Sequence, residues 1–134
     1  MKLELEKKLK DTFPSVLRKV KYFECKDGWY NLIYSACLLV QSENSRNEEK
    51  GVPAFEFVQI KEKFGTLRAY MSGTNDYCRG VVSNAEYLSG ITCEECGTPG
   101  RTRVYGGFWI TLCQSCADKF SQKRGMSEEE DEED

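Results

Sequence analysis

The sequence predicts an α+β protein in which helices pack on a small antiparallel sheet, and three observations lead to this class. The chain has 134 residues, of which 40% are hydrophobic and 31% are charged, so it is long enough for one folded domain. Residues 54–72 alternate between apolar and polar side chains around a central turn, as a β-hairpin does. The segments on either side carry apolar residues at helical spacing. We therefore expect a single domain over 1–125, with helices in 1–41 and 74–89 packed on the 54–72 hairpin.

The N-terminal segment 1–22 is predicted to be helical, with Pro14 dividing it into two pieces, because proline cannot lie inside a helix without a kink. Residues 1–26 hold eight Lys and Arg against four acidic residues, which we interpret as a solvated helix face. The side chains expected to be buried are the apolar ones at helical spacing: Leu5, Leu9, Phe13, Val16, Leu17 and Val20.

A second helix is predicted over 29–41, with Asp27 as its N-cap. Apolar side chains cover most of its circumference, so we place this helix at the centre of the domain. Those that share one face are Trp29, Leu32, Ile33, Ala36, Cys37 and Val40. The polar segment 42–51 that follows is predicted to be a surface loop.

The clearest strand is predicted over 54–63, with apolar residues on both of its faces. Phe57 points to one face and Ile60 to the other, which favours cover on both sides of the strand. The pair Phe64-Gly65 makes the turn, and 66–72 returns as the second strand. A third helix then runs from a cap at Thr74 or Asn75 to about residue 88.

Four of the seven cysteines form the pattern C-x2-C-x16-C-x2-C. Two residues between cysteines let a tight turn aim both sulfurs at one ion, and two such turns supply a closed tetrahedral set of thiolates. Between the pairs lie two β-prone runs, 101–105 and 108–112, joined by a Gly-Gly turn, and a short helix is predicted over 117–124. We therefore expect 91–120 to form a treble-cysteine-knuckle-like zinc ribbon. Its ligands to one structural Zn²⁺ are Cys93, Cys96, Cys113 and Cys116.

Disulfides are the competing interpretation of the cysteines. The odd cysteine count and the lack of an apolar signal segment after Met1 favour a reducing compartment, and hence the metal. No apolar run approaches the roughly 20 residues of a membrane span. The chain has no histidine to activate a thiol, so Cys25, Cys37 and Cys78 are expected to pack as small hydrophobic residues.

The net charge of −3 is unevenly distributed along the chain. Residues 128–134 are all acidic, and without them 15 acidic residues face 19 basic ones. The body is therefore weakly basic. The tail 126–134 is predicted to be disordered, because it has little to bury and its charges repel one another.

The predicted 54–72 hairpin places cations opposite one another. If Phe64-Gly65 is the turn, Lys61 lies across from Arg68, and Lys63 shares a face with Lys61. Like charges directly across a strand pair are destabilising, which favours a role in binding an anion or an acidic partner. Two alternatives stay open: Glu56, Glu62 or Glu86 offsets the cations, or the register differs by one residue.

Several of these motifs occur together in one chain. They are Gly28-Trp29-Tyr30, Lys61-Glu62-Lys63-Phe64-Gly65-x-Leu67-Arg68-x-Tyr70, Cys93-x-x-Cys96-Gly97-x-Pro99-Gly100 and Gly107-Phe108-Trp109-x-Thr111-Leu112-Cys113-x-x-Cys116. Over roughly 28–116 the chain resembles a family of small, largely uncharacterised zinc-ribbon proteins from bacteriophages and prophages. Relatives often carry His at the position matching Cys116, and either residue ligates zinc. The resemblance implies a phage origin, a zinc fold and the cytoplasm of an infected bacterial host, and it implies no reaction.

Our first functional hypothesis is a phage-type accessory protein that binds a host protein without catalysis, as an anti-defence inhibitor would. Its contact residues would be Lys61, Lys63 and Arg68, with Arg101 and Arg103 as a second patch. The sequence has no Ser-His, Cys-His or P-loop arrangement, and its carboxylates are scattered, so we do not expect an enzyme.

The second hypothesis is capture of a small anionic ligand such as a signalling nucleotide. Its phosphates would bind Lys or Arg, and its base would stack on Trp29, Tyr30 or Tyr70. Nucleic-acid binding ranks third, because a charge of about +4 over the body is far from the usual electrostatic footprint of such proteins.

Overall fold

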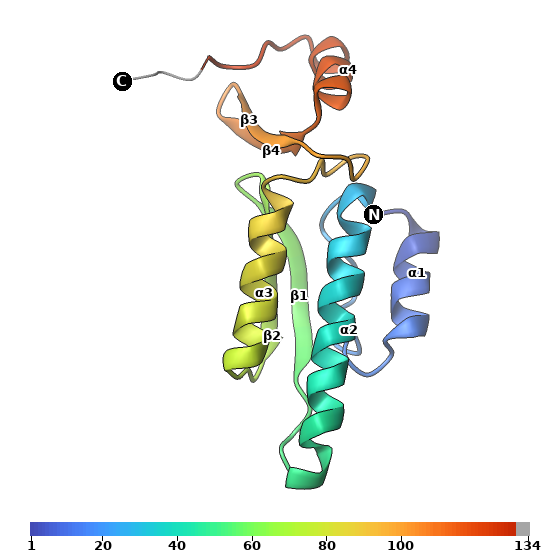
Figure 1. The fold of residues 1–134 in the computed structure, drawn as a ribbon. Helices are drawn as coiled ribbons and strands as arrows, with labels where there is room; N and C mark the ends of the chain where they lie inside the picture. The colour runs from blue at the N-terminus through green and yellow to red at the C-terminus, as the bar shows by residue number, and fades with distance from the viewer. Residues whose placement is uncertain (131–134) are drawn as a thin grey trace.

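The computed structural model describes residues 1–130 and has an α+β architecture (Figure 1). The described part contains four α-helices and two separate two-stranded antiparallel sheets. The β1–β2 hairpin and helices α1, α2 and α3 form the body, while β3, β4 and α4 lie together at one end of it (Figure 1). The elements are α1 Leu3–Thr12, a 3₁₀ turn Asp27–Trp29, α2 Tyr30–Asn47, a 3₁₀ turn Glu48–Lys50, β1 Glu56–Lys63, β2 Thr66–Ser72, α3 Asp76–Ser89, β3 Arg101–Tyr105, β4 Phe108–Leu112 and α4 Gln114–Arg124.

The division of the N-terminal segment at Pro14 is confirmed, but the second piece is not a helix. Helix α1 ends at Thr12, and residues 14–19 form turns. Proline has no N–H for a helical hydrogen bond, so α1 does not continue through Pro14. The apolar side chains predicted there are nevertheless buried, including Phe13, Val16 and Leu17.

Helix α2 is longer than the sequence predicted, and the expected loop at 42–51 is wrong. The helix runs to Asn47, and the following 3₁₀ turn ends at Gly51, whose φ is +69°. Asn44 binds both backbone groups of Phe55, accepting from its N–H at 2.8 Å and donating to its carbonyl at 3.0 Å. Glu43 is buried and accepts a hydrogen bond from the Asn75 side chain at 2.9 Å. Polar residues that the sequence placed in a loop therefore attach the end of α2 to the residue before β1 and to the N-cap of α3.

The register of the β1–β2 hairpin is the predicted one, with Lys61 opposite Arg68. The prediction of cover on both faces of β1 is wrong, because a β-bulge lies between Phe57 and Gln59. The extra residue turns Phe57 and Ile60 to the same side, and both are buried. Val58 is 38% exposed. The hairpin therefore has one core face and one outer face.

The main core lies where α2 and α3 pack on the inner face of the hairpin (Figure 1). Asn75 caps α3, as one of the two predicted alternatives, by accepting from the Cys78 N–H at 2.9 Å. Cys37 and Cys78 are buried in this core, as predicted for small hydrophobic residues. Among the described helices, none has the length and apolar character needed to cross a membrane.

Candidate metal centre

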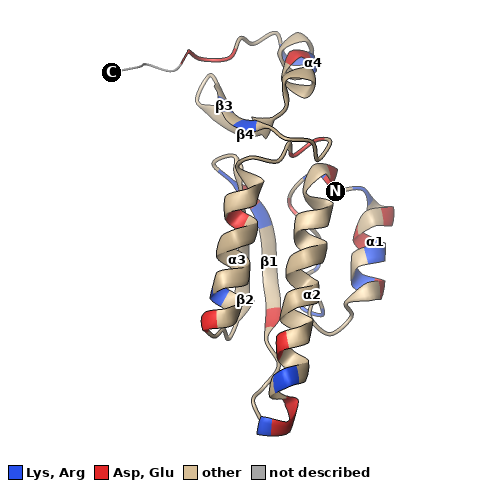
Figure 2. Ribbon diagram, in the orientation of Figure 1, with Lys and Arg blue, Asp and Glu red and all other residues tan. Residues whose placement is uncertain are grey.

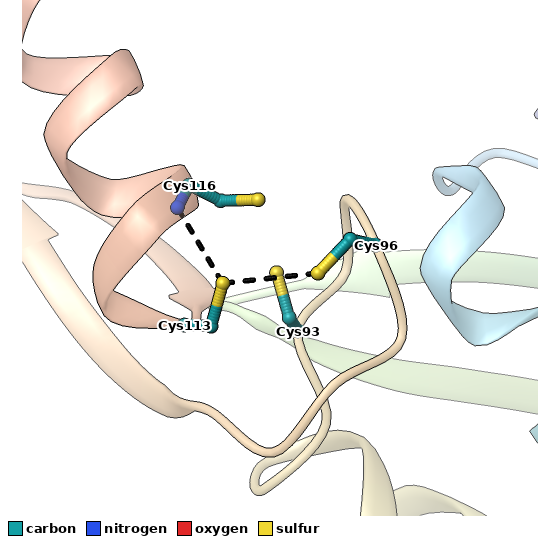
Figure 3. Close-up of side chains that lie close together, drawn as sticks. All are labelled: Cys93, Cys96, Cys113 and Cys116. Atoms are coloured by element: carbon teal, nitrogen blue, oxygen red, sulfur yellow. Dashed lines mark hydrogen bonds between the residues drawn. The ribbon is translucent and has the colours of Figure 1, made fainter.

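The four cysteines of the repeated C-x2-C pattern come together in space. Cys93 and Cys96 lie on the loop after α3, while Cys113 and Cys116 lie at the start of α4, and the four sulfurs point toward one another (Figure 3). All four Sγ atoms lie within 4.8 Å of one another, and Cys96 Sγ and Cys113 Sγ are 3.7 Å apart. A metal–sulfur bond of about 2.3 Å in a tetrahedron requires sulfurs roughly 3.8 Å apart. The cluster therefore fits a single tetrahedral metal ion.

Local backbone geometry explains why the two pairs meet. The β3–β4 hairpin turns at Gly106-Gly107, with φ of +57° and +83°, and pairs Arg101 with Leu112 at its open end. The open end therefore places Cys113 beside the turn 93–97, which we call the first knuckle. In that knuckle the Gly97 N–H donates to the Cys93 carbonyl at 2.9 Å, and Gly97 has a φ of +84°, which favours glycine.

Hydrogen bonds stabilise the thiolate form of two of the sulfurs. The Cys116 N–H donates to Cys113 Sγ at 3.4 Å, and this bond, followed by the Thr98 side chain, lowers the pKa of the Cys113 thiol to about 6. The Thr98 hydroxyl lies 3.0 Å from Cys96 Sγ and lowers the pKa of Cys96. Burial raises the pKa values of Cys93 and Cys116. A bound divalent cation overcomes such a cost, because a coordinating thiol is deprotonated outright.

The first knuckle is packed tightly on the connection between α1 and α2. The Gly28 N–H donates to the Glu94 carbonyl at 2.7 Å, and a Cβ at Gly28 would lie 2.1 Å from the Cys93 carbonyl oxygen. The Lys26 N–H donates to the Glu94 carboxylate at 3.1 Å, and burial raises the pKa of Glu94 to about 7. The cysteine-bearing loop is thus attached to the body by its own backbone.

The aromatic residues proposed to stack on a ligand occupy other places. Trp29 is 0% exposed and donates from Nε1 to the Thr92 carbonyl at 2.9 Å, so its role as a stacking surface is wrong. It is a core residue that also holds the loop before Cys93. Tyr30 is half-buried and packs beside Tyr34, with ring centroids 6.2 Å apart. Tyr70 is exposed on the outer face of β2.

The predicted cations of the β1–β2 hairpin do share one face. Lys61 and Lys63 alternate along β1, and Arg68 is the cross-strand partner of Lys61. Figure 2 shows Lys and Arg positions at the upper part of this hairpin, toward the end that carries β3 and β4. Within residues 1–130, no carboxylate forms an ion pair with any of the three. We name Lys61, Lys63, Arg68 and Tyr70 the outer hairpin face.

The carboxylates considered as counter-charges for that face have other partners. Glu56 binds Arg18 at 2.9 Å and Lys19 at 3.1 Å. Glu62 accepts from the Gly65 N–H at 2.8 Å, and Glu86 accepts from the Ala69 N–H at 3.3 Å. The cations of the outer hairpin face therefore remain available for an external anion.

The second predicted basic patch is already occupied by the chain itself. Arg103 is only 5% exposed and donates to the Leu112 carbonyl at 3.0 Å and to Glu128 at 3.1 Å, so its role as a surface contact is wrong. Arg101 forms an ion pair with Glu128 at 2.8 Å. The Glu129 N–H donates to the Val104 carbonyl at 2.7 Å. The described tail residues 126–130 thus lie against β3, where the sequence predicted disorder, and 131–134 lie outside the described residues.

Two exposed aromatic residues next to the outer hairpin face were missed by the sequence reasoning. Phe64 is 66% exposed at the tip of the β1–β2 hairpin, and Trp109 is 47% exposed on β4. Their rings meet edge to face, with centroids 6.5 Å apart. For Phe64 the sequence does carry a signal, which is an aromatic residue in a two-residue hairpin turn, where asparagine or glycine is usual.

The remaining cysteines are far less acidic than the two activated ones. Burial raises the pKa values of Cys25 and Cys37 to about 12, and it also raises that of Cys78. These thiols are protonated near neutral pH and buried, which fits a packing role.

Comparisons of the chain with protein-family models, with curated proteins and with solved structures find no match. The fold and the site therefore define the class of protein: an α+β protein with a four-cysteine cluster that can hold a metal ion.

Proposed function

We propose that the cluster is a structural zinc site and that 91–120 is a zinc ribbon. The support is a donor set of four sulfurs in tetrahedral spacing, which is typical of Zn²⁺ in closed structural sites. Four protein ligands would leave no position for a reacting water, so the ion would stabilise the fold. It would do so by tying the loop after α3 to the start of α4.

Removal of one ligand tests this assignment. Cys113→Ser is expected to lose the one zinc equivalent and to unfold at least 93–120, since zinc contributes roughly 10–16 kcal/mol in small zinc peptides. Metal content by mass spectrometry and amide hydrogen exchange measure the two effects. The matched control is Cys78→Ala, a buried cysteine outside the cluster, which should keep the metal. A Cys113→Ser protein with one zinc equivalent and native exchange would contradict the assignment.

We further propose that the protein acts by binding and not by catalysis, as a phage-type accessory protein that engages a host protein through the outer hairpin face. The observation that carries this proposal is the row of cations on β1 and β2 without a carboxylate partner within residues 1–130. Like charges across a strand pair destabilise the fold, and an acidic partner surface would offset this destabilisation on binding.

Co-purification from the bacterial host tests the binding function. A protein partner should be retained by the wild type and lost by the triple variant Lys61→Gln, Lys63→Gln, Arg68→Gln, because neutral amides cannot form the charged contacts. The matched control changes cations that already have acidic partners, Arg18→Gln with Lys19→Gln. Equal recovery of the same partner by all three proteins would refute the role of the outer hairpin face.

A second candidate function has its own observation. A pocket of about 430 Å³ lies between the first knuckle and α4, and its lining includes Lys26, Lys119, Phe120, Lys123 and Arg124. Four cations beside an aromatic ring suit a small anionic ligand such as a nucleotide. Glu95, which pairs with Lys26 at 3.1 Å, and the nearby thiolates would offset part of this charge, so we rank the pocket second. Calorimetry against a nucleotide panel tests it, and flat traces for every member would remove it.

A further inference from the structure

Phe64 has an unusual backbone conformation for its residue type. Within residues 1–130 it is the one non-glycine residue with positive φ, at +52°, and Gly65 follows at +84°. Such a two-residue hairpin turn needs positive φ at both positions and strongly favours Asn-Gly or Gly-Gly. A bulky side chain in the left-handed region is a genuine outlier, and outliers of this kind cluster at functional sites.

The Phe64 side chain gains little from the fold that would explain this conformation. Two thirds of it is exposed, and its aromatic neighbour Trp109 is itself half-exposed on another sheet. The turn is instead held by the next residue: the Gly65 carbonyl accepts from the Thr111 hydroxyl at 2.6 Å, and a Cβ at Gly65 would lie 2.8 Å from the Thr102 side chain. The fold therefore fixes the turn and leaves the Phe64 ring outside.

The exposed rings are continuous with the cations of the outer hairpin face. Lys63 Nζ lies 5.6 Å from the centre of the Phe64 ring, and Lys63 shares its strand face with Lys61. An aromatic pair beside cations that have no carboxylate partner within residues 1–130 resembles a binding hot spot, since hot spots are enriched in Trp, Tyr and Arg. A partner complementary to this surface would present an apolar side chain flanked by carboxylates.

We propose that Phe64 and Trp109 form the anchor site of this surface and that they bind an acidic protein segment through one apolar side chain. This inference rests on the proposed binding function and names its partner chemistry. A protein segment is favoured over nucleic acid, because the whole chain carries −3 and includes seven consecutive acidic residues. These charges repel a polymer with a negative charge on every unit more strongly than a segment with only a few carboxylates. The acidic segment would place its carboxylates on Lys61, Lys63 and Arg68.

The test begins with selection of binders from a random peptide library on the full, metal-loaded protein. The selected peptides should contain Asp or Glu around one large apolar residue. Their affinity follows from Trp109 fluorescence, since the other tryptophan, Trp29, is fully buried. Phe64→Asn should weaken binding by more than about tenfold. The same change should raise the melting temperature by roughly 2–5 °C, because asparagine is tolerated at positive φ.

Two controls separate an anchor from a merely structural residue. Phe64→Trp keeps a large aromatic ring and should retain binding. Tyr87→Gln removes an aromatic side chain that is 71% exposed on α3, and should change nothing. Because Phe64→Asn is expected to be more stable than the wild type, loss of binding in it cannot be attributed to unfolding.

The outcomes that overturn the proposal are distinct from one another. If Phe64→Asn binds the selected peptides as the wild type does, while the triple variant of Lys61, Lys63 and Arg68 does not, the anchor is wrong and the binding function stands. Selection of no peptide, or of peptides without acidic residues, refutes both. Single-stranded DNA that binds more tightly than any peptide, and is lost in Phe64→Asn, would assign the surface to nucleic acid.

Discussion

The contact between Gly28 and the first knuckle gives the sharpest prediction about what holds the molecule together. In Gly28→Ala the new methyl carbon would lie 2.1 Å from the Cys93 carbonyl oxygen and 2.5 Å from that of Glu94. Both atoms belong to backbone that is itself hydrogen-bonded, so no side-chain rotation relieves the overlap. The knuckle must move away, and the bond from the Gly28 N–H to the Glu94 carbonyl, now 2.7 Å, must lengthen or break.

The size of the effect follows from these two terms. Overpacking costs about 1–3 kcal/mol and a lost backbone hydrogen bond about 0.5–1.5 kcal/mol, so Gly28→Ala should lose about 2–4 kcal/mol of unfolding free energy. Urea denaturation followed by circular dichroism measures it, and faster loss of the metal to a chelator should accompany it. Gly80→Ala is the matched control: apart from neighbouring residues and backbone of α3 itself, no atom lies within 4 Å of the added Cβ, so alanine should stabilise by about 0.5–1 kcal/mol. Equal midpoints for Gly28→Ala and the wild type would refute the packing of the knuckle on the body.

Two further predictions concern charges. Glu128→Gln should destabilise the protein by about 1–2 kcal/mol, because the buried Arg103 guanidinium loses its carboxylate, while Glu130→Gln should have no effect; thermal melts compare them. Hydrogen bonds and charge from Arg18, and to a smaller extent Lys19, lower the pKa of Glu56 from 4.5 to about 2, so this carboxylate stabilises the fold at pH values above the unfolded pKa and loses that effect as pH falls toward 2. The melting temperature of Glu56→Gln should therefore lie below that of the wild type near neutral pH and converge with it at the acidic end; a gap that widens on acidification would contradict this.

The parts of the fold that the sequence predicted correctly depend on short-range chemistry. Gly106 and Gly107 both adopt positive φ, which forms the predicted turn, and β3 and β4 have their predicted bounds on either side of it. The Phe64-Gly65 turn likewise determines that Lys61 faces Arg68. The four-cysteine cluster follows from spacing, since each pair is closed by its own tight turn.

The parts that were not predicted depend on contacts between distant segments. The bulge at Val58 changes which side chains face the core, and no local signal in the strand indicates it. Trp29 and Arg103 have residue types common at binding surfaces, but the Thr92 carbonyl and Glu128 bind them inside the molecule. Burial of a polar or amphipathic side chain depends on whether a partner is present, and the partners here are more than 20 residues away.

The four-cysteine cluster and the exposed aromatic pair are structurally linked through one residue of β4. Thr111 donates its hydroxyl proton to the Gly65 carbonyl at 2.6 Å and accepts at its own carbonyl from the Glu94 N–H at 2.9 Å. It therefore connects the residue after Phe64 with the residue after Cys93, and it lies two positions from both Trp109 and Cys113. An ion that holds Cys93 to Cys113 would keep both bonds of Thr111 in place, and with them the spacing of the two rings. On the proposals made above, zinc supports partner binding without touching the partner, because it fixes Trp109 beside Phe64.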